Sequence, residues 1–186
     1  MRLSDTTLLN NRTQRPLPLT QLGFGGAPLG NLYRRISEAD AQATLDAAWD
    51  AGIRYFDTAP QYGLGRSELR FADALTRFDQ DALILSTKVG RVLHDCAPQD
   101  VTPEAFVDVP QKRIVFDYTY DGIMRSYHDS VARLGTDRID MLFLHDIDAG
   151  THGAAGEDEK LRELFSQGGY RALTELRSAG QIAAIG

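Results

Sequence analysis

Hydrophobic and polar positions along this 186-residue chain alternate between two periods. Short apolar runs, typical of buried strands, are followed by stretches in which apolar residues recur every three or four positions, as in amphipathic helices. The apolar runs cover residues 22–27, 54–57, 82–88, 139–145 and 182–185. The helical patterns follow them at about 37–52, 67–76, 120–134 and 170–178. The second of these carries Leu69, Ala72, Leu75 and Thr76 on the side that is expected to face inward. Because strands that alternate with helices pair in parallel, the pattern predicts a parallel sheet built from βα units.

The βα unit occurs four times, and a fifth strand follows. A complete (β/α)₈ TIM barrel takes about 250 residues. We therefore expect an α/β protein in which residues 1–186 form a single barrel domain that covers roughly the first half, from the first to the fifth strand. The pattern stops in the middle of a unit, so the barrel is expected to be truncated on its C-terminal side. Half a barrel has two unpaired strand edges.

Two connections between strands and helices exceed the usual two to six residues. One runs from about residue 90 to 119 and contains three prolines, and the other runs from 146 to 169 and is rich in Gly, Asp and Glu. Both follow strands, so we expect both to border the active-site end of the barrel as loops that influence substrate choice. A disordered insertion is the alternative, and the composition of the acidic second connection favours it more than that of the first.

The composition excludes several classes of function. The net charge is −6 and the basic residues are scattered, so neither nucleic acid nor an anionic membrane is an expected partner. A single cysteine, Cys96, cannot form an internal disulfide, which fits a reducing cytoplasm. The first twenty residues are polar, and no run of about eighteen apolar residues occurs. We therefore expect a cytoplasmic protein without a signal peptide or membrane span.

Three polar residues close three of the predicted strands. Asp57, Lys88 and His145 end the runs at 54–57, 82–88 and 139–145, and Tyr62 lies just past Asp57. Taken singly, these residues have ordinary explanations as a turn cap, a surface lysine, a hydrogen-bonded core histidine and a loop aromatic. The carboxyl ends of parallel barrel strands, however, meet at the active-site end. Four such residues on successive strands therefore indicate a catalytic site.

The four residue types have complementary chemistry. Tyrosine has a reference pKa of about 10 and is a poor base at neutral pH, but a nearby ammonium favours the phenolate. Lys88 could supply that ammonium, and Asp57 could hold it charged and in place. His145 could orient a substrate oxygen. The pattern predicts that Tyr62 gives or takes the proton of an alcohol or carbonyl group.

The remaining candidates are weaker. His128 is expected on the solvated face of a helix, and His94 and His152 fall in the long connections, from which His152 could reach a substrate. No His, Cys or carboxylate spacing indicates a metal site. The glycines at 23, 25 and 26 lack the spacing of a dinucleotide-binding fingerprint and are not followed by a helix start.

Several sequence motifs resemble those of a known family. FDTAPQYG (56–63), STKVG (86–90) and IDMLFLHD (139–146) in combination resemble the aldo-keto reductases. FDYTYDGIMRS (116–126) is similar to the group that contains D-threo-aldose 1-dehydrogenases, L-fucose dehydrogenases and pyridoxal 4-dehydrogenase. The resembling stretches span nearly all of the chain after residue 20. One departure is Phe71-Ala72, where the family often has Leu-Gly, and it concerns helix packing.

The resemblance implies a function and its residues. The family's catalytic tetrad falls on Asp57, Tyr62, Lys88 and His145, and Gly26 and Asp57 are expected near the cofactor. That cofactor is NAD or NADP, bound without a Rossmann motif and with its other contacts beyond residue 186. The implied reaction is oxidation of an aldose at C1 to a lactone, or reduction of a related aldehyde, with pyridoxal or a simple aldehyde or alcohol as the alternative substrate. A homo-oligomer is a further possibility.

Two other classes of function compete with this interpretation. A Schiff-base lyase also uses a lysine at a barrel strand end, although a lysine paired with a carboxylate stays charged. A non-catalytic binding or regulatory subunit is the second alternative. The complete set of four residues disfavours it, and the expected absence of half the barrel favours it.

Overall fold

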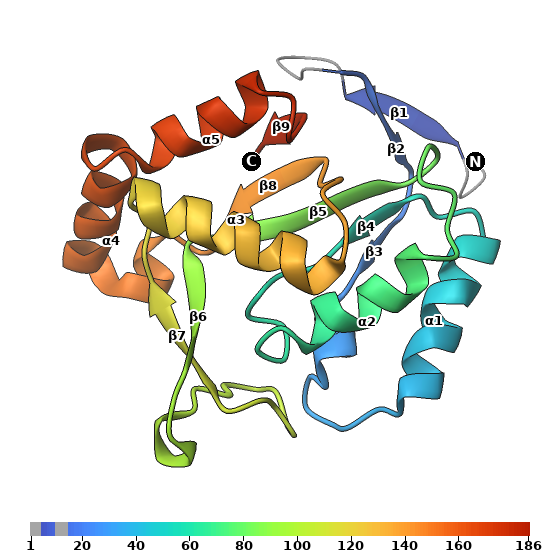
Figure 1. Ribbon diagram of the computed structural model, residues 1–186, viewed down its shortest axis with the longest axis horizontal. Helices are drawn as coiled ribbons and strands as arrows, with labels where there is room; N and C mark the ends of the chain where they lie inside the picture. Colours follow the sequence, from blue (N-terminus) through green and yellow to red (C-terminus); the bar gives the residue numbers. More distant parts are fainter. Residues whose placement is uncertain (1–4, 10–14) are drawn as a thin grey trace.

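The computed structural model describes residues 5–9 and 15–186. Its centre is a five-stranded sheet in the order β3 (Gly23–Gly25), β4 (Tyr55–Asp57), β5 (Ile84–Val89), β8 (Met141–Leu144) and β9 (Ala184–Ile185) (Figure 1). All four pairs of neighbours are parallel, which confirms the predicted βα architecture. The carboxyl ends of these strands consequently meet at one edge of the sheet.

Four helices connect the strands of this sheet and pack against it (Figure 1). They are α1 (Glu38–Asp50), α2 (Arg66–Leu75), α3 (Tyr120–Leu134) and α5 (Gly169–Ser178). Ser37 caps α1, because its Oγ accepts a hydrogen bond from the Asp40 N–H at 3.0 Å. α3 has the predicted bounds and ends at Gly135, whose φ of 65° terminates the helix.

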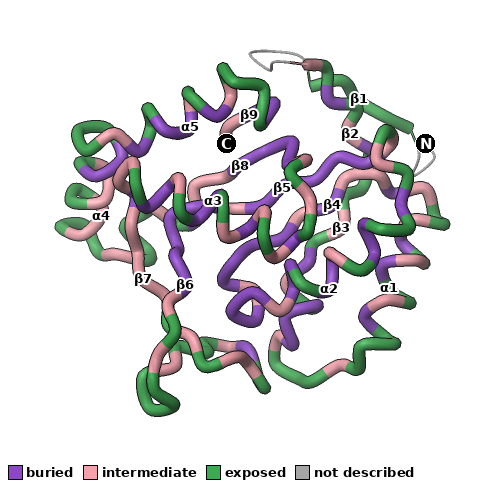
Figure 2. Tube along the Cα trace, viewed as in Figure 1, coloured by how far each residue is buried: buried purple, intermediate pink, exposed green. Residues whose placement is uncertain are grey.

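The hydrophobic core lies between the helices and the sheet, where the chain is buried along the strands (Figure 2). Aromatic side chains fill one part of it. Phe56 of β4 contacts Phe71 of α2 edge to face at 6.1 Å between ring centroids, and Trp49 stacks on Phe78 at 4.4 Å. Burial of such large side chains supplies most of the driving force that holds helices on a sheet.

A hairpin that the sequence did not indicate covers the amino ends of the strands. β1 (Thr6–Leu9) pairs antiparallel with β2 (Leu17–Thr20). Leu17 is fully buried against Ile84 and Met141, which begin β5 and β8. The Thr20 hydroxyl accepts from the Arg54 N–H at 3.2 Å, which fixes the hairpin to the chain before β4. The expectation that the first twenty residues hold no signal peptide falls in part on residues 1–4 and 10–14, outside those described.

Both long connections contain regular structure, so the prediction of loops was wrong. The first forms the antiparallel hairpin β6 (Arg91–Asp95) and β7 (Lys112–Phe116), which projects from the body of the molecule (Figure 1), with the short η2 (Pro98–Asp100) between them. The second forms α4 (Ala149–Ser166). The Asp148 side chain caps α4 by accepting from the Thr151 N–H at 3.1 Å. Gly153, at φ 69° and ψ 164°, interrupts the helix and hides its period in the sequence.

The buried face of α2 also differs from the prediction. Leu69, expected inside, is 54% exposed, whereas Phe71 is fully buried. The helix turns Glu68 inward instead, because Arg133 Nε of α3 donates to Glu68 Oε2 at 2.5 Å and the Thr87 hydroxyl donates to its Oε1 at 2.8 Å. A buried carboxylate with two such donors is satisfied, so the hydrophobic pattern alone misassigned the face.

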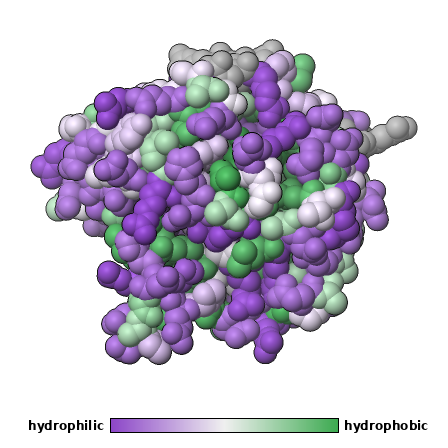
Figure 3. All heavy atoms as spheres, viewed as in Figure 1, coloured by the Kyte–Doolittle hydropathy of each residue, from purple (hydrophilic) through white to green (hydrophobic). Residues whose placement is uncertain are grey.

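The face of the molecule shown in Figure 3 is mostly hydrophilic, with smaller hydrophobic patches between the hydrophilic residues. No helix among the described residues is long and apolar enough to cross a membrane.

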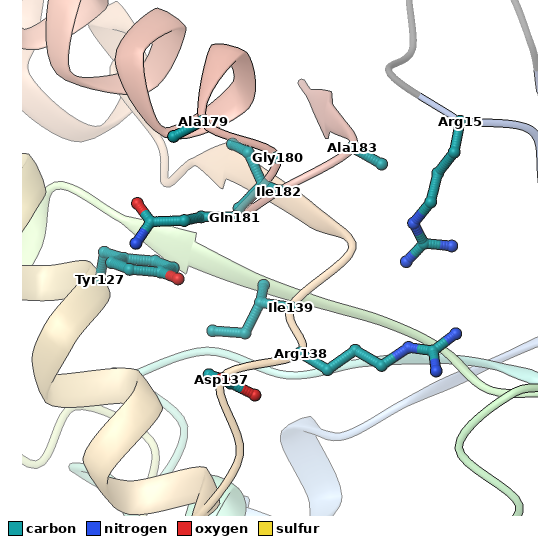
Figure 4. A pocket seen from close by; sticks show the side chains of 10 residues that line it. All are labelled: Arg15, Tyr127, Asp137, Arg138, Ile139, Ala179, Gly180, Gln181, Ile182 and Ala183. Carbon is teal, nitrogen blue, oxygen red and sulfur yellow. The ribbon is translucent and has the colours of Figure 1, made fainter.

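A hollow of about 450 Å³ lies beside the segments that lead into β8 and β9, and α3 and the turn after α5 border it (Figure 4). Arg15, Arg138 and Gln181 line it at the amino ends of the strands, away from the residues predicted to be catalytic.

Phe71→Ala should lower the free energy of unfolding of the complete protein by about 3–5 kcal/mol, because it leaves a cavity among the core aromatics. Leu69→Ala, two residues away on the exposed side of the same helix, should change it by less than about 0.5 kcal/mol. Urea unfolding monitored by circular dichroism measures both. Equal losses in the two variants would contradict the assigned face.

Candidate functional site

Asp57 and Lys88 form an ion pair at the carboxyl edge of the sheet. Asp57 is the last residue of β4, and Lys88 is the penultimate residue of β5. Lys88 Nζ donates to Asp57 Oδ2 at 2.6 Å and to the Thr58 carbonyl at 2.9 Å. The Ser86 hydroxyl donates to Asp57 Oδ1 at 2.6 Å. Both charged side chains are largely buried, and the short ion pair fixes the position of the lysine ammonium.

Tyr62 lies beside this pair. It follows β4 in a tight loop, where its N–H donates to the Ala59 carbonyl at 3.1 Å and its carbonyl accepts from the Ser67 N–H at 3.1 Å. Lys88 Nζ lies 4.7 Å from the centroid of the Tyr62 ring. A cation at this distance interacts favourably with the face of the ring.

His145 is the fourth member of the cluster and also lies beside Tyr62. It directly follows β8, and its N–H donates to the Val89 carbonyl at 3.0 Å. The centroids of the His145 and Tyr62 rings are 5.9 Å apart, with the planes nearly perpendicular. Burial, and then the cations of Arg91 and Lys88, lower the pKa of His145 from 6.5 to about 3. The imidazole is therefore neutral at physiological pH.

The structure thus brings all four predicted residues, Asp57, Tyr62, Lys88 and His145, together at one place. It does not test their catalytic role, which stays a prediction.

Gly26 lies close to the cluster, and its N–H donates to the Asp57 carbonyl at 2.7 Å. A Cβ on Gly26 would lie 2.7 Å from Phe71 Cε2. Packing alone therefore requires a glycine there, and its predicted contact with a cofactor stays a prediction.

Several polar residues around the cluster were missed from the sequence. Ser86 holds Asp57, and Arg91 pairs with Asp146 at 2.6 Å. Ser86 could have been found, because it lies two positions before Lys88 on the same strand and therefore on the same face. Arg91 and Asp146 gave no such signal, because they meet only through the fold.

The other histidines do not join the four. His128 is exposed on α3. His152, on α4, packs edge-on against Phe116 with 4.6 Å between ring centroids, and its Nε2 lies 3.5 Å from the Tyr118 hydroxyl. In the described part of the chain, no group of three or more His, Cys, Asp or Glu side chains is arranged to hold a metal ion.

Half of a parallel βα barrel with this cluster at its carboxyl end defines a class of protein. Residues 21–186 match the model of the Aldo/keto reductase family, and the chain belongs to that family. It is 46% identical over 179 residues to a pyridoxal 4-dehydrogenase from Microbacterium luteolum and 40% identical over 174 residues to a D-threo-aldose 1-dehydrogenase from a Pseudomonas species.

The fold agrees with this assignment. A glycerol dehydrogenase from Gluconobacter oxydans superimposes with a TM-score of 0.68 at 26% sequence identity, over 98% of this chain and 48% of that structure. The two curated relatives are each matched over 91% of this chain and over 52% and 50% of their own lengths. The chain therefore spans about half the length of the relatives it matches, and the partial TIM barrel expected from the sequence is confirmed.

The imidazole of His145 should stay neutral from pH 7 down to about pH 4. The unfolded chain protonates this residue near pH 6.5, so between pH 6.5 and about 3 the unfolded state binds the additional proton. The contribution of His145 to stability is therefore complete above pH 6.5 and is lost as the pH falls through that window. NMR titration of ¹³C-labelled histidines, assigned with a His145→Gln variant, measures the midpoint. A midpoint near 6.5 would contradict the described environment.

Proposed function

We propose that this chain carries the catalytic half of an NAD(P)-dependent oxidoreductase that oxidises an aldose at C1 to a lactone. One observation supports the proposal above the others. The Lys88 ammonium, held by Asp57, lies 4.7 Å from the centroid of the Tyr62 ring, and the neutral His145 imidazole meets the same ring edge to face at 5.9 Å between centroids. Membership of the aldo/keto reductase family and 40% identity to a D-threo-aldose 1-dehydrogenase agree with it.

The proposed proton transfer uses only residues of this cluster. The hydroxyl on C1 of the cyclic sugar gives its proton to Tyr62 while C1 loses a hydride and its C–O bond becomes the lactone carbonyl. Lys88 favours the tyrosine phenolate that accepts the proton, and Asp57 keeps Lys88 charged. His145 hydrogen-bonds the reacting oxygen and orients it. In the reverse direction, Tyr62 gives the proton back to the carbonyl oxygen.

A nicotinamide cofactor, NAD or NADP, supplies the hydride acceptor of such a reaction. Among the described residues, one position beside the cluster has room for a flat ring. Gly25 pairs with Asp57 in the sheet, and a Cβ built on it meets no atom within 4 Å. Paired residues of neighbouring strands present side chains to the same face, so the missing side chain of Gly25 leaves space next to Asp57. Gly25 and Asp57 would therefore border the ring.

Pyridoxal is the second candidate substrate, because the 46% identical relative is a pyridoxal 4-dehydrogenase. Pyridoxal carries a hydroxymethyl group beside its aldehyde and closes to a cyclic hemiacetal, as aldoses do. The same C–H and O–H bonds would then break in both substrates. The common feature of the proposed substrates is a hemiacetal carbon in a five- or six-membered ring.

The ion pair disfavours the Schiff-base alternative. Schiff-base formation needs a neutral amine, and Lys88 Nζ donates to both Asp57 and the Thr58 carbonyl. A purely binding or regulatory role would leave the arrangement of Tyr62, Lys88 and His145 without a use. Borohydride trapping with a carbonyl substrate, followed by mass spectrometry, tests the Schiff-base alternative directly.

Tyr62→Phe in the complete protein should lower turnover by about 10²–10⁴-fold, because it removes the group that transfers the proton. The fold should persist, since only a hydroxyl is lost. Tyr170→Phe, which removes a hydroxyl from the outer surface of α5, is the matched control and should keep normal rates. Steady-state assays of nicotinamide absorbance measure both variants. Near-normal turnover of Tyr62→Phe would remove Tyr62 from the mechanism.

The complete protein should reduce the nicotinamide cofactor when it is given a cyclic hemiacetal. L-Fucose, D-arabinose, L-xylose and pyridoxal, each with NAD and with NADP, form the panel, and lactone formation identifies the product. An open-chain alcohol such as glycerol is the control for the ring requirement. Turnover of pyridoxal alone would select the second candidate, and inactivity throughout the panel would contradict the proposed reaction.

A further inference from the structure

One buried guanidinium adjoins the cluster and takes no part in the proposed proton transfer. Arg91 begins β6, and only 4% of its side chain is exposed. Its Nη2 donates to Asp146 Oδ2 at 2.6 Å, and its Nη1 donates to Glu104 Oε1 at 3.4 Å. A cation this buried is stable only with anionic partners that offset its desolvation. Arg91, Glu104 and Asp146 together form the Arg91 clamp.

The clamp connects Tyr62 and His145, the two residues that would face the reacting oxygen, through their neighbours in the chain. Asp146 follows His145 in the chain, and its Oδ2 lies 3.7 Å from His145 Nε2. Glu104 accepts a hydrogen bond from the side chain of Gln61, the residue before Tyr62. A continuous series of polar contacts therefore runs from the neighbour of Tyr62, through Glu104 and Arg91, to the neighbour of His145.

Both carboxylates of the clamp belong to residues with an unusual backbone. Glu104 has a φ of 50° and Asp146 a φ of 45°, in the left-handed region that residues with a side chain seldom adopt. Such conformations persist where the surroundings hold them, and they are common at functional sites. Arg91 is the shared partner of both residues. Its guanidinium therefore holds two residues in this conformation, one in contact with Gln61 and one in contact with His145.

The surroundings of the imidazole show how far the effect of Arg91 extends. Charged or titratable side chains face His145 from each adjoining segment: Tyr62 after β4, Lys88 on β5, Arg91 on β6 and the adjacent Asp146. The Tyr118 hydroxyl, after β7, donates to the His145 carbonyl at 2.5 Å. Among the charged groups, the cations Arg91 and Lys88 lower the pKa of His145. Removal of Arg91 would change both the position and the charge environment of this ring.

We propose that Arg91 is a positioning residue: by holding Asp146 and Glu104, it fixes the His145 imidazole relative to the Tyr62 hydroxyl. This inference rests on the proposed function, because it assigns Arg91 a task in the same reaction. Arg91 itself touches no reacting atom in this scheme.

Three variants of the complete holoenzyme test the proposal. Arg91→Met removes the charge, Arg91→Lys keeps a charge that cannot bridge two carboxylates equally well, and Arg113→Met removes an exposed arginine from the same hairpin as a control. In Arg91→Met, kcat should fall by about 10–100-fold with little change in KM, because geometry and not binding is lost. The NMR midpoint of His145 should rise by about one pH unit or more. Arg91→Lys should restore the midpoint more fully than kcat, and Arg113→Met should match the wild type.

Unchanged kcat and an unchanged His145 midpoint in a folded Arg91→Met variant would overturn the proposal. A loss of stability with an unchanged midpoint would also overturn it, since that result describes a purely structural arginine. If Arg91→Met does not fold, Glu104→Gln carries the test, because this side chain is 46% exposed. A lower kcat at constant KM supports the proposal there, and an unchanged kcat contradicts it. Tyr62→Phe, measured alongside, reports separately on the proposed function: normal turnover of that variant contradicts the reaction itself, whereas a loss of turnover in Tyr62→Phe with unchanged turnover in Arg91→Met contradicts only the positioning role of Arg91.

Discussion

The parallel register between β4 and β5 is the constraint on which the site depends. It places Asp57 opposite Ser86, two residues before Lys88. Side chains alternate along a strand, so Ser86 and Lys88 share a face and both reach the same carboxylate. A slip of one residue would turn both side chains to the opposite face of the sheet and leave Asp57 without either partner. The core packing of Phe56 and Leu85 fixes the register, because these neighbours point the other way and are fully buried.

Buried arginines hold the loops that border the site. Arg70 of α2, almost fully buried, donates to the Leu29 carbonyl at 2.6 Å and to Asn31 Oδ1 at 2.9 Å, and it pairs with Glu38. The segment after η1 (Ala27–Gly30) is thereby held against α2. That segment in turn pairs with the chain around Phe106. The same arrangement recurs at the Arg91 clamp, where a buried arginine joins carboxylates from two separate loops. Hydrogen-bonded ionic networks of this kind favour one loop conformation over others.

The fold could be predicted from the sequence where local patterns are strong. The bounds of α3 followed from its apolar face and Gly135, and the four strand-end candidates followed from the alternation of strands and helices. The pattern failed where tertiary contacts decide. α4 was hidden by its glycines, the hairpin of β6 and β7 by its prolines, and the inward face of α2 by the pairing of Glu68 with Arg133. The clamp was also out of reach, because Arg91 meets Asp146 across 55 residues of chain, and no spacing rule connects them.

The charges around His145 bear on which group transfers the proton. Burial, and then the cations Arg91 and Lys88, lower the pKa of this histidine, and each of the two cations is paired with a carboxylate. The imidazole is consequently kept neutral without leaving an unpaired charge beside it. A neutral imidazole can hydrogen-bond the substrate oxygen but cannot release a proton to it as an imidazolium would. In the proposed reaction, this leaves Tyr62 as the group that exchanges the proton, and it separates the task of orienting the oxygen from the task of protonating it.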